Sequence, residues 1–363
     1  GDVVDASTFD LTAAATLNLN NGTTSLDRTV GTLIFGDTNA SNATTFNWTV
    51  AANGGAGSNP KLILDGGSTT PTIQVNNGTT TITAVVAGSQ GFIKTGAGTL
   101  VLANAGDLIT GGINLNAGAL SFSTGALNNN TITVTGNTTL NWNNAGDVTD
   151  LSSKIILGNG FTLTLGLSGG ATDNTVFAST IATSGGNGGG IVKSNAGILT
   201  ITAQQVYTGG TKVNNGRLVL TGGNDRLATT GTITLGNGAN SGVVQLGDIT
   251  GASNQTIAGL TVSGTGTANG FVGGNATISI LTINNAANIA AASSPILGGA
   301  GTNENNLALV KSGAGSLSLA KNNTFVGDVT LIGGNLTVTN NGSLGVGPKT
   351  VTISGTVNAP SLQ

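Results

Sequence analysis

Apolar residues alternate with polar or small residues in short runs along most of the chain. Leu100 and Leu102 lie on one side of such a run, and Leu120 and Phe122 repeat the pattern 20 residues later. Because successive side chains of a β-strand point to opposite faces, this alternation predicts short strands with one buried face. A return after about 20 residues predicts a β-solenoid, in which each strand stacks on the equivalent strand of the previous turn, or rung.

Three segments share a longer pattern, and their lysines, Lys94, Lys193 and Lys311, lie 99 and 118 residues apart. The segments read IKTGAGTLVL, IVKSNAGILT and LVKSGAGSLS, and each continues into a second alternating run (INLNAGALSF, TKVNNGRLVL, VTLIGGNLTV). Repeats of this kind are typical of stacked architectures. We therefore expect an all-β chain that forms one continuous solenoid over residues 1–363. Its three sequence modules should cover about 15–135, 136–236 and 237–354.

The repeated phrase has the composition of a corner between two strands. Each copy supplies a glycine where the chain would turn and an alanine small enough to pack inside a tight corner. These residues are Ala97, Gly98, Ala196, Gly197, Ala314 and Gly315. We expect the three lysines to be exposed, with stems that cover apolar surface and charges that protect strand edges. Lysines several rungs apart do not form one ligand site, so we interpret the phrase as a structural joint.

A β-sandwich or barrel built from hairpins is the alternative fold. Its support is Asn-Gly, a strong signal for two-residue hairpin turns. The chain contains this pair at Asn21-Gly22, Asn77-Gly78, Asn215-Gly216 and Asn341-Gly342. However, solenoid corners also require positive φ, which Asn and Gly tolerate. The regular rung length and an aromatic content of only 3% favour the solenoid.

Composition removes several classes of function. The chain lacks Cys and His, which excludes disulfides, thiol and imidazole catalysis and nearly all structural zinc sites. Its 11 basic residues are scattered and its net charge is -3, which argues against nucleic acid as a partner. No apolar run approaches the ~18 residues of a transmembrane helix. With Gly1 in place of Met, the balance is typical of a secreted bacterial surface protein from which a signal sequence has been removed, or of a fragment of one.

The series K-T/S-G-A-G-x-L-x-L, then Y-T-G-G-T, then x-N-x-G-x-L resembles the autotransporter-associated β-strand repeat. The clearest copy runs from residue 192 to 224. The resemblance implies a right-handed parallel β-helix that is exported and displayed outside a Gram-negative-type bacterium. It also implies a scaffold role for the repeat, with no catalytic residues attached to the motif.

Candidate chemistry is sparse. The 14 carboxylates include a single Glu, Glu304, and the closest pair away from the N-terminus is Asp147 and Asp150 in GDVTDLS. These two aspartates form a solvated turn or a weak Ca²⁺ contact. A β-helical polysaccharide lyase would need clustered acids beside a basic residue, and none of the three arginines, Arg28, Arg217 and Arg226, has an Asp cluster nearby, apart from Asp225 beside Arg226. We expect no catalytic residue, no cofactor and no firm metal site.

Two other kinds of side chain could mark a ligand surface. Trp48 and Trp142 each alternate with apolar residues, so we interpret both as core and not as platforms for sugar rings. Arg217 and Arg226 could approach each other across rungs. Neither feature outweighs the repetitive scaffold around it.

The function that fits best is that of a non-catalytic extracellular structural protein, which builds or extends a bacterial surface fibre or matrix. Residues 1–15 and 350–363 contain no amphipathic helix to cover the solenoid ends, so we expect end-to-end self-association. The alternatives are an autotransporter passenger acting as an adhesin, whose receptor or glycan the sequence does not identify, and a β-helical polysaccharide lyase or hydrolase.

Overall fold

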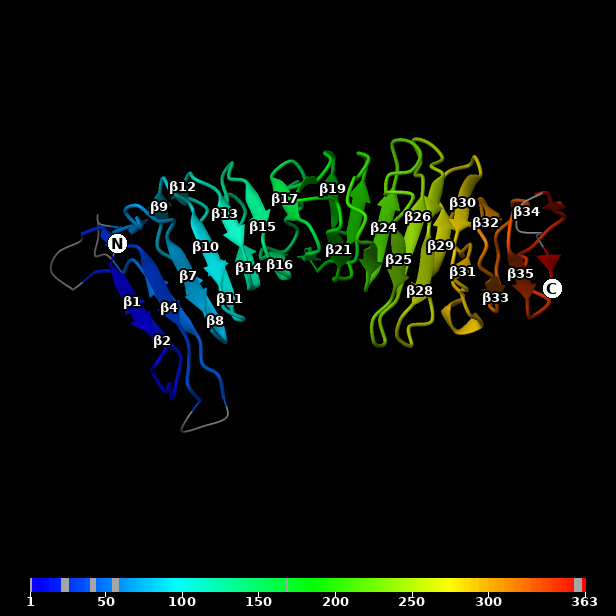
Figure 1. The fold of residues 1–363 in the computed structure, drawn as a ribbon. Helices are drawn as coiled ribbons and strands as arrows, with labels where there is room; N and C mark the ends of the chain where they lie inside the picture. Colours follow the sequence, from blue (N-terminus) through cyan, green and yellow to red (C-terminus); the bar gives the residue numbers. More distant parts are fainter. Residues whose placement is uncertain (1, 21–25, 40–43, 54–58, 168, 356–360) are drawn as a thin grey trace. The chain divides into compact units, whose positions relative to one another are not determined.

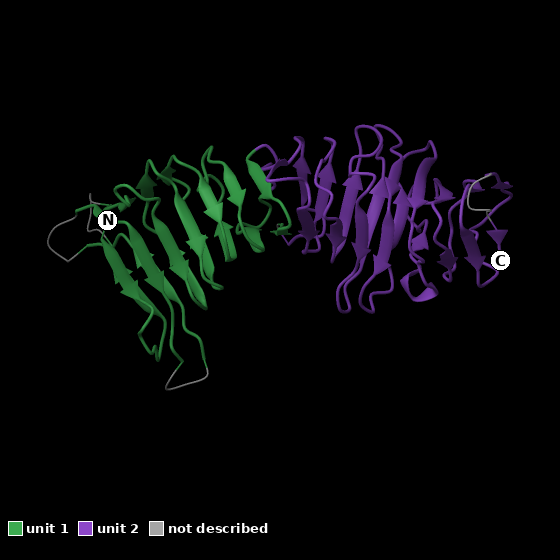
Figure 2. Cartoon of the chain, viewed as in Figure 1, with its two compact units in different colours: residues 1–147, 154–168 green, residues 148–153, 169–363 purple. Residues whose placement is uncertain are grey.

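The computed structural model describes residues 2–20, 26–39, 44–53, 59–167, 169–355 and 361–363. Within these residues the chain forms short β-strands, and its one helix is a single 3₁₀ turn, η1 (Ala291–Ser293). Neighbouring strands in every sheet run parallel, one rung above the next. The predicted parallel β-helix is therefore confirmed. The chain divides into two compact units, residues 1–147 with 154–168 and residues 148–153 with 169–363 (Figure 2).

Unit 1 contains three stacks of strands (Figure 1). Its first sheet comprises β1 (Val3–Ala6), β4 (Thr32–Phe35), β7 (Thr72–Val75), β10 (Phe92–Thr95), β13 (Ile113–Leu115), β15 (Ile132–Val134) and β17 (Ile155–Gly158). Its second sheet comprises β2 (Ala15–Asn18), β5 (Trp48–Ala51), β8 (Thr79–Ile82), β11 (Thr99–Leu102), β14 (Gly118–Phe122), β16 (Thr138–Trp142) and β18 (Thr162–Gly166). The third and smallest sheet comprises β3 (Arg28–Val30), β6 (Leu62–Leu64), β9 (Val86–Gly88) and β12 (Leu108–Ile109).

Unit 2 repeats this plan. One sheet contains β19 (Asn174–Phe177), β22 (Ile198–Ile201), β24 (Gly216–Leu220), β26 (Gly242–Leu246), β29 (Gly270–Gly273) and β31 (Ile296–Leu297). A second stack contains β21 (Gly190–Lys193), β23 (Thr211–Val213), β25 (Thr232–Leu235) and β28 (Gly259–Val262). A third contains β27 (Gln255–Ile257), β30 (Ser279–Asn284), β32 (Leu307–Ser312), β34 (Val329–Leu331) and β36 (Val351–Ile353). The remaining strands are β20 (Ala182–Ser184), β33 (Leu317–Leu319), β35 (Asn335–Val338) and β37 (Ser361–Leu362).

Apolar columns inside the stacked rungs form the core. In the first sheet of unit 1, Phe92, Ile113, Ile132 and Ile155 lie in register on successive strands and are 0% exposed. Paired residues in these rungs are 19 to 23 positions apart in the chain, which agrees with the expected rung of about 20 residues. Each such side chain contributes about 1.5–3 kcal/mol by leaving water.

Glycines allow the rungs to approach closely at the corners. Gly118 adopts φ 70°, and a Cβ there would lie 2.4 Å from the carbonyl oxygens of Gly96 and Gly98. Gly78 and Gly216, from the predicted Asn-Gly pairs, adopt φ 61° and 71° at equivalent corners, whereas Asn21-Gly22 lies outside the described residues. At Gly78 and Gly216 the Asn-Gly pair turns the chain into a strand that pairs in parallel with its neighbours, and it does not form a hairpin.

The predicted packing of the corner alanines is wrong. Ala97 and Ala314 are exposed and Ala196 is half-buried, because each points outward from its turn. The lysine of each repeat occupies the interior side of the corner. Both tryptophans, in contrast, are core residues as predicted: Trp48 and Trp142 are 9% and 5% exposed.

Candidate functional site: the lysine of each repeat

The three repeated lysines lie inside the fold, contrary to the prediction that they are exposed. Lys94, Lys193 and Lys311 are each 0% exposed. Lys94 occupies a place in an apolar column, paired with Ile73 on one side and Leu115 on the other. The three lysines end strands β10, β21 and β32 or come one residue before the end. Their equivalent positions make them one recurrent site, which we call the lysine site.

Each ammonium group binds backbone carbonyl oxygens of two successive rungs. Lys94 Nζ donates to Thr95 O (2.7 Å) and Gly96 O (3.0 Å) in its own turn and to Ala117 O (3.2 Å) in the next rung. These acceptors come from the corner on which Gly118 packs. The lysine stem thus fills the core while its charged end joins two turns.

The other two copies reproduce this geometry. Lys193 Nζ donates to the carbonyl oxygens of Asn195 (2.5 Å) and Asn215 (2.8 Å). Lys311 Nζ donates to those of Ser312 (2.5 Å), Gly313 (3.1 Å) and Gly333 (3.1 Å). In all three copies the acceptor in the following rung immediately precedes the corner glycine of that rung. The repeated phrase is therefore a joint, as expected, but its lysine is the part that fastens it.

Burial governs the electrostatics of the lysine sites. Desolvation lowers the pKa of Lys94, Lys193 and Lys311 from the ordinary value of 10.5 to about 8 in each case. The one ion pair between described side chains, Arg217 with Glu304, lies elsewhere, so carbonyl dipoles and not carboxylates compensate these charges. A lysine of lowered pKa can act as a nucleophile where substrate reaches it. Here Nζ is enclosed and directed at backbone oxygens, an arrangement suited to fastening rungs.

A second recurrent position carries a buried polar group. Gln205 accepts a hydrogen bond from Ile181 N (2.9 Å) and donates to Ser179 O (3.1 Å), both in the preceding rung. In the third repeat Asn323 likewise accepts from Leu297 N (2.9 Å) in the preceding rung, but it donates to Ser343 O (2.6 Å) in the following one. The first repeat has Asp107 in this place. Its Oδ1 accepts from Val86 N (2.8 Å), but Oδ2 is buried without a hydrogen-bond partner. Burial raises the pKa of Asp107 to about 7, so this carboxyl holds a proton more readily than usual.

The arginines noted in the sequence serve separate contacts. Arg217 Nη2 lies 2.7 Å from Glu304 Oε1, and Arg217 Nη1 donates to Gln245 Oε1 (2.5 Å), which links neighbouring rungs of unit 2. Arg226 donates to the backbone oxygens of Thr202 and Asn224. Neither set of partners includes the other arginine, although the sequence suggested that the two could approach each other. Sequence reasoning missed the pair with Glu304, whose partners are 87 positions apart.

The predicted weak metal candidates each bind protein atoms. Asp147 is 7% exposed and its Oδ2 accepts a hydrogen bond from Thr124 Oγ1 (2.8 Å). Asp150 accepts from Ser152 N (2.8 Å) and Ala178 N (3.0 Å). Among the residues that the structure describes, no three Asp, Glu, His or Cys side chains gather as a metal site would require. The expectation of no firm metal site, with Asp147 and Asp150 as weak candidates, stays a prediction.

Comparison with known families supports the interpretation of the repeat. The family model of the passenger-associated transport repeat matches residues 92–122, 191–220 and 309–338. The chain carries three transport repeats. Each contains one lysine site, from its inward lysine to the rung that supplies the second carbonyl. The matched segments cover about a quarter of the 363 residues, and the transport repeat indicates a passenger-type β-helix of a secreted or surface-exposed protein.

No curated protein and no solved structure is similar enough to the chain to count as a match. No helix in the described part of the chain is long and apolar enough to span a bilayer.

Proposed function

We propose that this protein is a non-catalytic structural element of the bacterial surface or extracellular matrix, which extends and associates end to end. The observation that carries the proposal is that the outermost described strands have unpaired edges beside exposed apolar side chains. The transport repeats support an exported scaffold. The lysine sites support it further, because the three buried lysines join successive rungs and do not face a substrate cavity.

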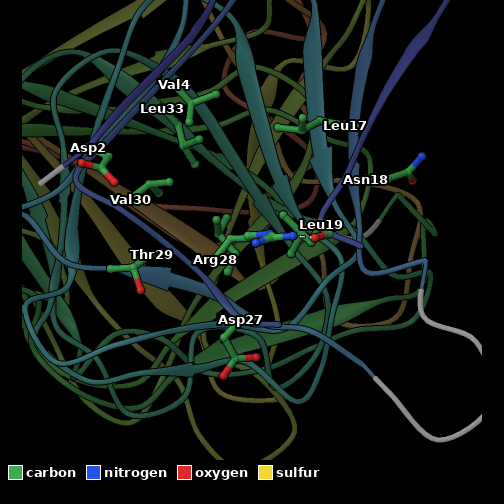
Figure 3. Close-up of a pocket in the computed structure, with 11 residues that line it drawn as sticks. Asp2, Val4, Leu17, Asn18, Leu19, Asp27, Arg28, Thr29, Val30 and Leu33 are labelled. Atoms are coloured by element: carbon green, nitrogen blue, oxygen red, sulfur yellow. Dashed lines mark hydrogen bonds between the residues drawn. The ribbon is translucent and has the colours of Figure 1, made fainter. Parts of the chain in front are cut away.

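The N-terminal end of unit 1 has unpaired strand edges. β1, β2 and β3 each pair with a strand on one side only. A hollow of about 490 Å³ opens between them, lined by the apolar side chains of Val4, Leu17 and Leu33 and by the stem of Arg28. Figure 3 shows Arg28 reaching toward Leu19, whose carbonyl oxygen accepts from Nε (2.9 Å). Edges and apolar surface of this kind favour the addition of further strands.

The C-terminal end of unit 2 offers the complementary features. β36 and β37 also pair on one side only. Ile353 continues the column of the buried Leu331, and Leu362 continues that of Leu336, yet they are 51% and 42% exposed. A rung placed beyond them would bury both side chains.

Charge favours contact between unlike ends. The first 30 residues carry four exposed aspartates, Asp2, Asp5, Asp10 and Asp27, against Arg28 alone. The last 45 residues carry Lys321 and Lys349 against Asp328. The N-terminal end of one copy therefore attracts the C-terminal end of another, and repulsion opposes contact between two N-terminal ends. A head-to-tail contact that does not close on itself generates a filament.

Electron microscopy and sedimentation velocity over a range of concentrations test this proposal. We expect filaments that shorten as salt rises, and loss of assembly in Leu17→Asp and Ile353→Asp. Ile249→Asp is the matched control, because Ile249 is 92% exposed and lies between β26 and β27, outside the outermost strands of either unit. A wild-type chain that stays monomeric at high concentration, or end variants that assemble like Ile249→Asp, would refute end-to-end association.

Action as an adhesin is the second candidate function. It is favoured by the second sheet of unit 1, whose strands contain no charged residue and present an uncharged surface separate from the two ends.

A further inference from the structure

The second sheet of unit 1 presents an uncharged surface of hydroxyl groups. None of its strands, from β2 to β18, contains a charged residue. The side chains that point away from the core form two files across the strands, which together we call the hydroxyl face. One file is Thr79, Thr99, Ala119, Thr139 and Thr164, and the other is Thr16, Thr49, Thr81, Val101, Ser121, Asn141 and Gly166. In the second file Val101 and Ser121 are buried (9% and 6% exposed), so the first file supplies most of the accessible hydroxyl groups at the centre of the face.

The hydroxyl groups of this face are available to an external ligand. Those of Thr79, Thr99, Thr139 and Thr164 have no hydrogen-bond partner among the described residues, and none is buried beyond the reach of water. The strands place them in register at intervals of about 4.8 Å along the stack. Each hydroxyl can both donate and accept, and each adjoins a methyl group.

A hollow of about 490 Å³ lies in the same face. Ala119 and Gly118 form its floor, beside the walls supplied by Asn137, Thr139 and Thr164. It extends over the rungs of β14, β16 and β18, a length of about 10 Å at the usual strand spacing. Such a trough is open along the stacking direction, as a chain-like ligand requires.

Unit 2 has a hollow of about 410 Å³ at the equivalent corner, but with different chemistry. Arg217 follows Gly216 there as Ala119 follows Gly118 in unit 1, and Val243 stands where unit 1 has Thr139. The fold thus creates the hollow in both units, and the side chains make only that of unit 1 uncharged and rich in hydroxyl groups.

We propose that the hydroxyl face and its hollow bind an extended, uncharged polysaccharide that lies along the stack. Sugar hydroxyl groups donate and accept as the threonines do, and the floor of small side chains admits a sugar ring. A peptide strand would need an unpaired edge, which inner strands of a sheet do not offer. Nucleic acid or an acidic glycan would need basic side chains, and a membrane would need a basic or broadly apolar surface.

Substitutions taken from the equivalent positions of unit 2 test the proposal without a foreign side chain at any of the three positions. Ala119→Arg introduces the residue that unit 2 has in the equivalent place and puts a long, positively charged side chain on the floor of the hollow. Asn114→Lys introduces the residue that unit 2 has at Lys212, adds the same charge and lies on another sheet of unit 1. Thr139→Val removes one hydroxyl group and introduces the side chain that unit 2 has at Val243. Circular dichroism verifies that all three variants fold.

Affinity electrophoresis through gels containing soluble neutral β-glucan, neutral α-glucan or alginate provides the measurement. We expect wild-type retention by at least one neutral glucan, a loss of at least tenfold in affinity for Ala119→Arg, a loss of several-fold for Thr139→Val and no change for Asn114→Lys. Absence of retention by both neutral glucans overturns the proposal. So does retention by alginate alone, or equal loss in Ala119→Arg and Asn114→Lys. None of these outcomes depends on end-to-end association, because Asn114, Ala119 and Thr139 lie on the inner strands β13, β14 and β16.

Discussion

Replacing the lysine of one transport repeat by methionine should loosen that repeat. Lys311→Met keeps an unbranched stem in the core but removes the donor to the carbonyl oxygens of Ser312, Gly313 and Gly333. A buried carbonyl without a donor costs about 1–3 kcal/mol, so three cost about 6 kcal/mol. Relief from burying an ammonium returns about 3 kcal/mol, the equivalent of lowering the lysine pKa from 10.5 to about 8. The net loss is about 3 kcal/mol.

Hydrogen exchange followed by mass spectrometry is the appropriate assay, because rungs of a stacked fold open in separate segments. A loss of about 3 kcal/mol corresponds to roughly 100-fold faster exchange of the amides in β32 and β34. Amides of unit 1 should be unaffected.

Lys321→Met is the matched control, because Lys321 is exposed and belongs to the same repeat. It should exchange like the wild type. If Lys311→Met and Lys321→Met behave alike, the carbonyl contacts do not stabilise the repeat and the interpretation of the lysine site is wrong.

The buried ionisable groups and the corner glycines allow three more tests. Because the folded lysine sites titrate near pH 8 and unfolded lysine near 10.5, the unfolded chain binds more protons between these values. The free energy of unfolding should therefore rise from pH 8 to pH 10 in urea titrations, and a triple lysine-to-methionine variant should lack this rise. Asp107 has a pKa of about 7 when folded, so the folded chain binds more protons than the unfolded chain between pH 4 and pH 7, and Asp107 lowers the free energy of unfolding as pH rises through this range. Asp107→Asn should remove this contribution and raise the free energy of unfolding at pH 8 by about 2–4 kcal/mol. An unchanged pH profile would contradict this. Gly118→Ala should lower the melting temperature far more than Gly146→Ala. Both glycines have φ near 70°, but a Cβ at Gly118 would lie 2.4 Å from two carbonyl oxygens, whereas a Cβ at Gly146 meets nothing within 4 Å. Equal effects would show that backbone strain alone determines the loss.

The sequence was sufficient to predict the fold because apolar residues carry both the period-two alternation and the near-constant spacing between successive rungs. The parallel stack, the rung length and the buried tryptophans followed from them. The lysine site was not predictable in the same way. In Phe92-Ile93-Lys94 and its two equivalents, apolar residues occupy both faces of the strand, so alternation does not say which face the lysine shares.

Long-range polar contacts were also beyond the sequence. Nothing in the chain marks Glu304 as the partner of Arg217, because their contact depends on rungs that stack between them. The place of Asp107 could have been suspected from its alignment with Gln205 and Asn323 once the repeats were superposed. That comparison shows an acceptor where the other two repeats have an amide that also donates.

Because its rungs pair in register, this molecule can change in length without a change in how its interior packs. Ile113 pairs with Phe92 below it and with Ile132 above it, and all three belong to the same column. Excising residues 113–131 would bring Ile132 onto Phe92 with inward and outward faces preserved, and duplicating the segment would add a turn in the same way. A gene for such a chain can therefore be shortened or extended in whole turns by recombination, and the reach of the protein from a surface can change while its interior stays the same.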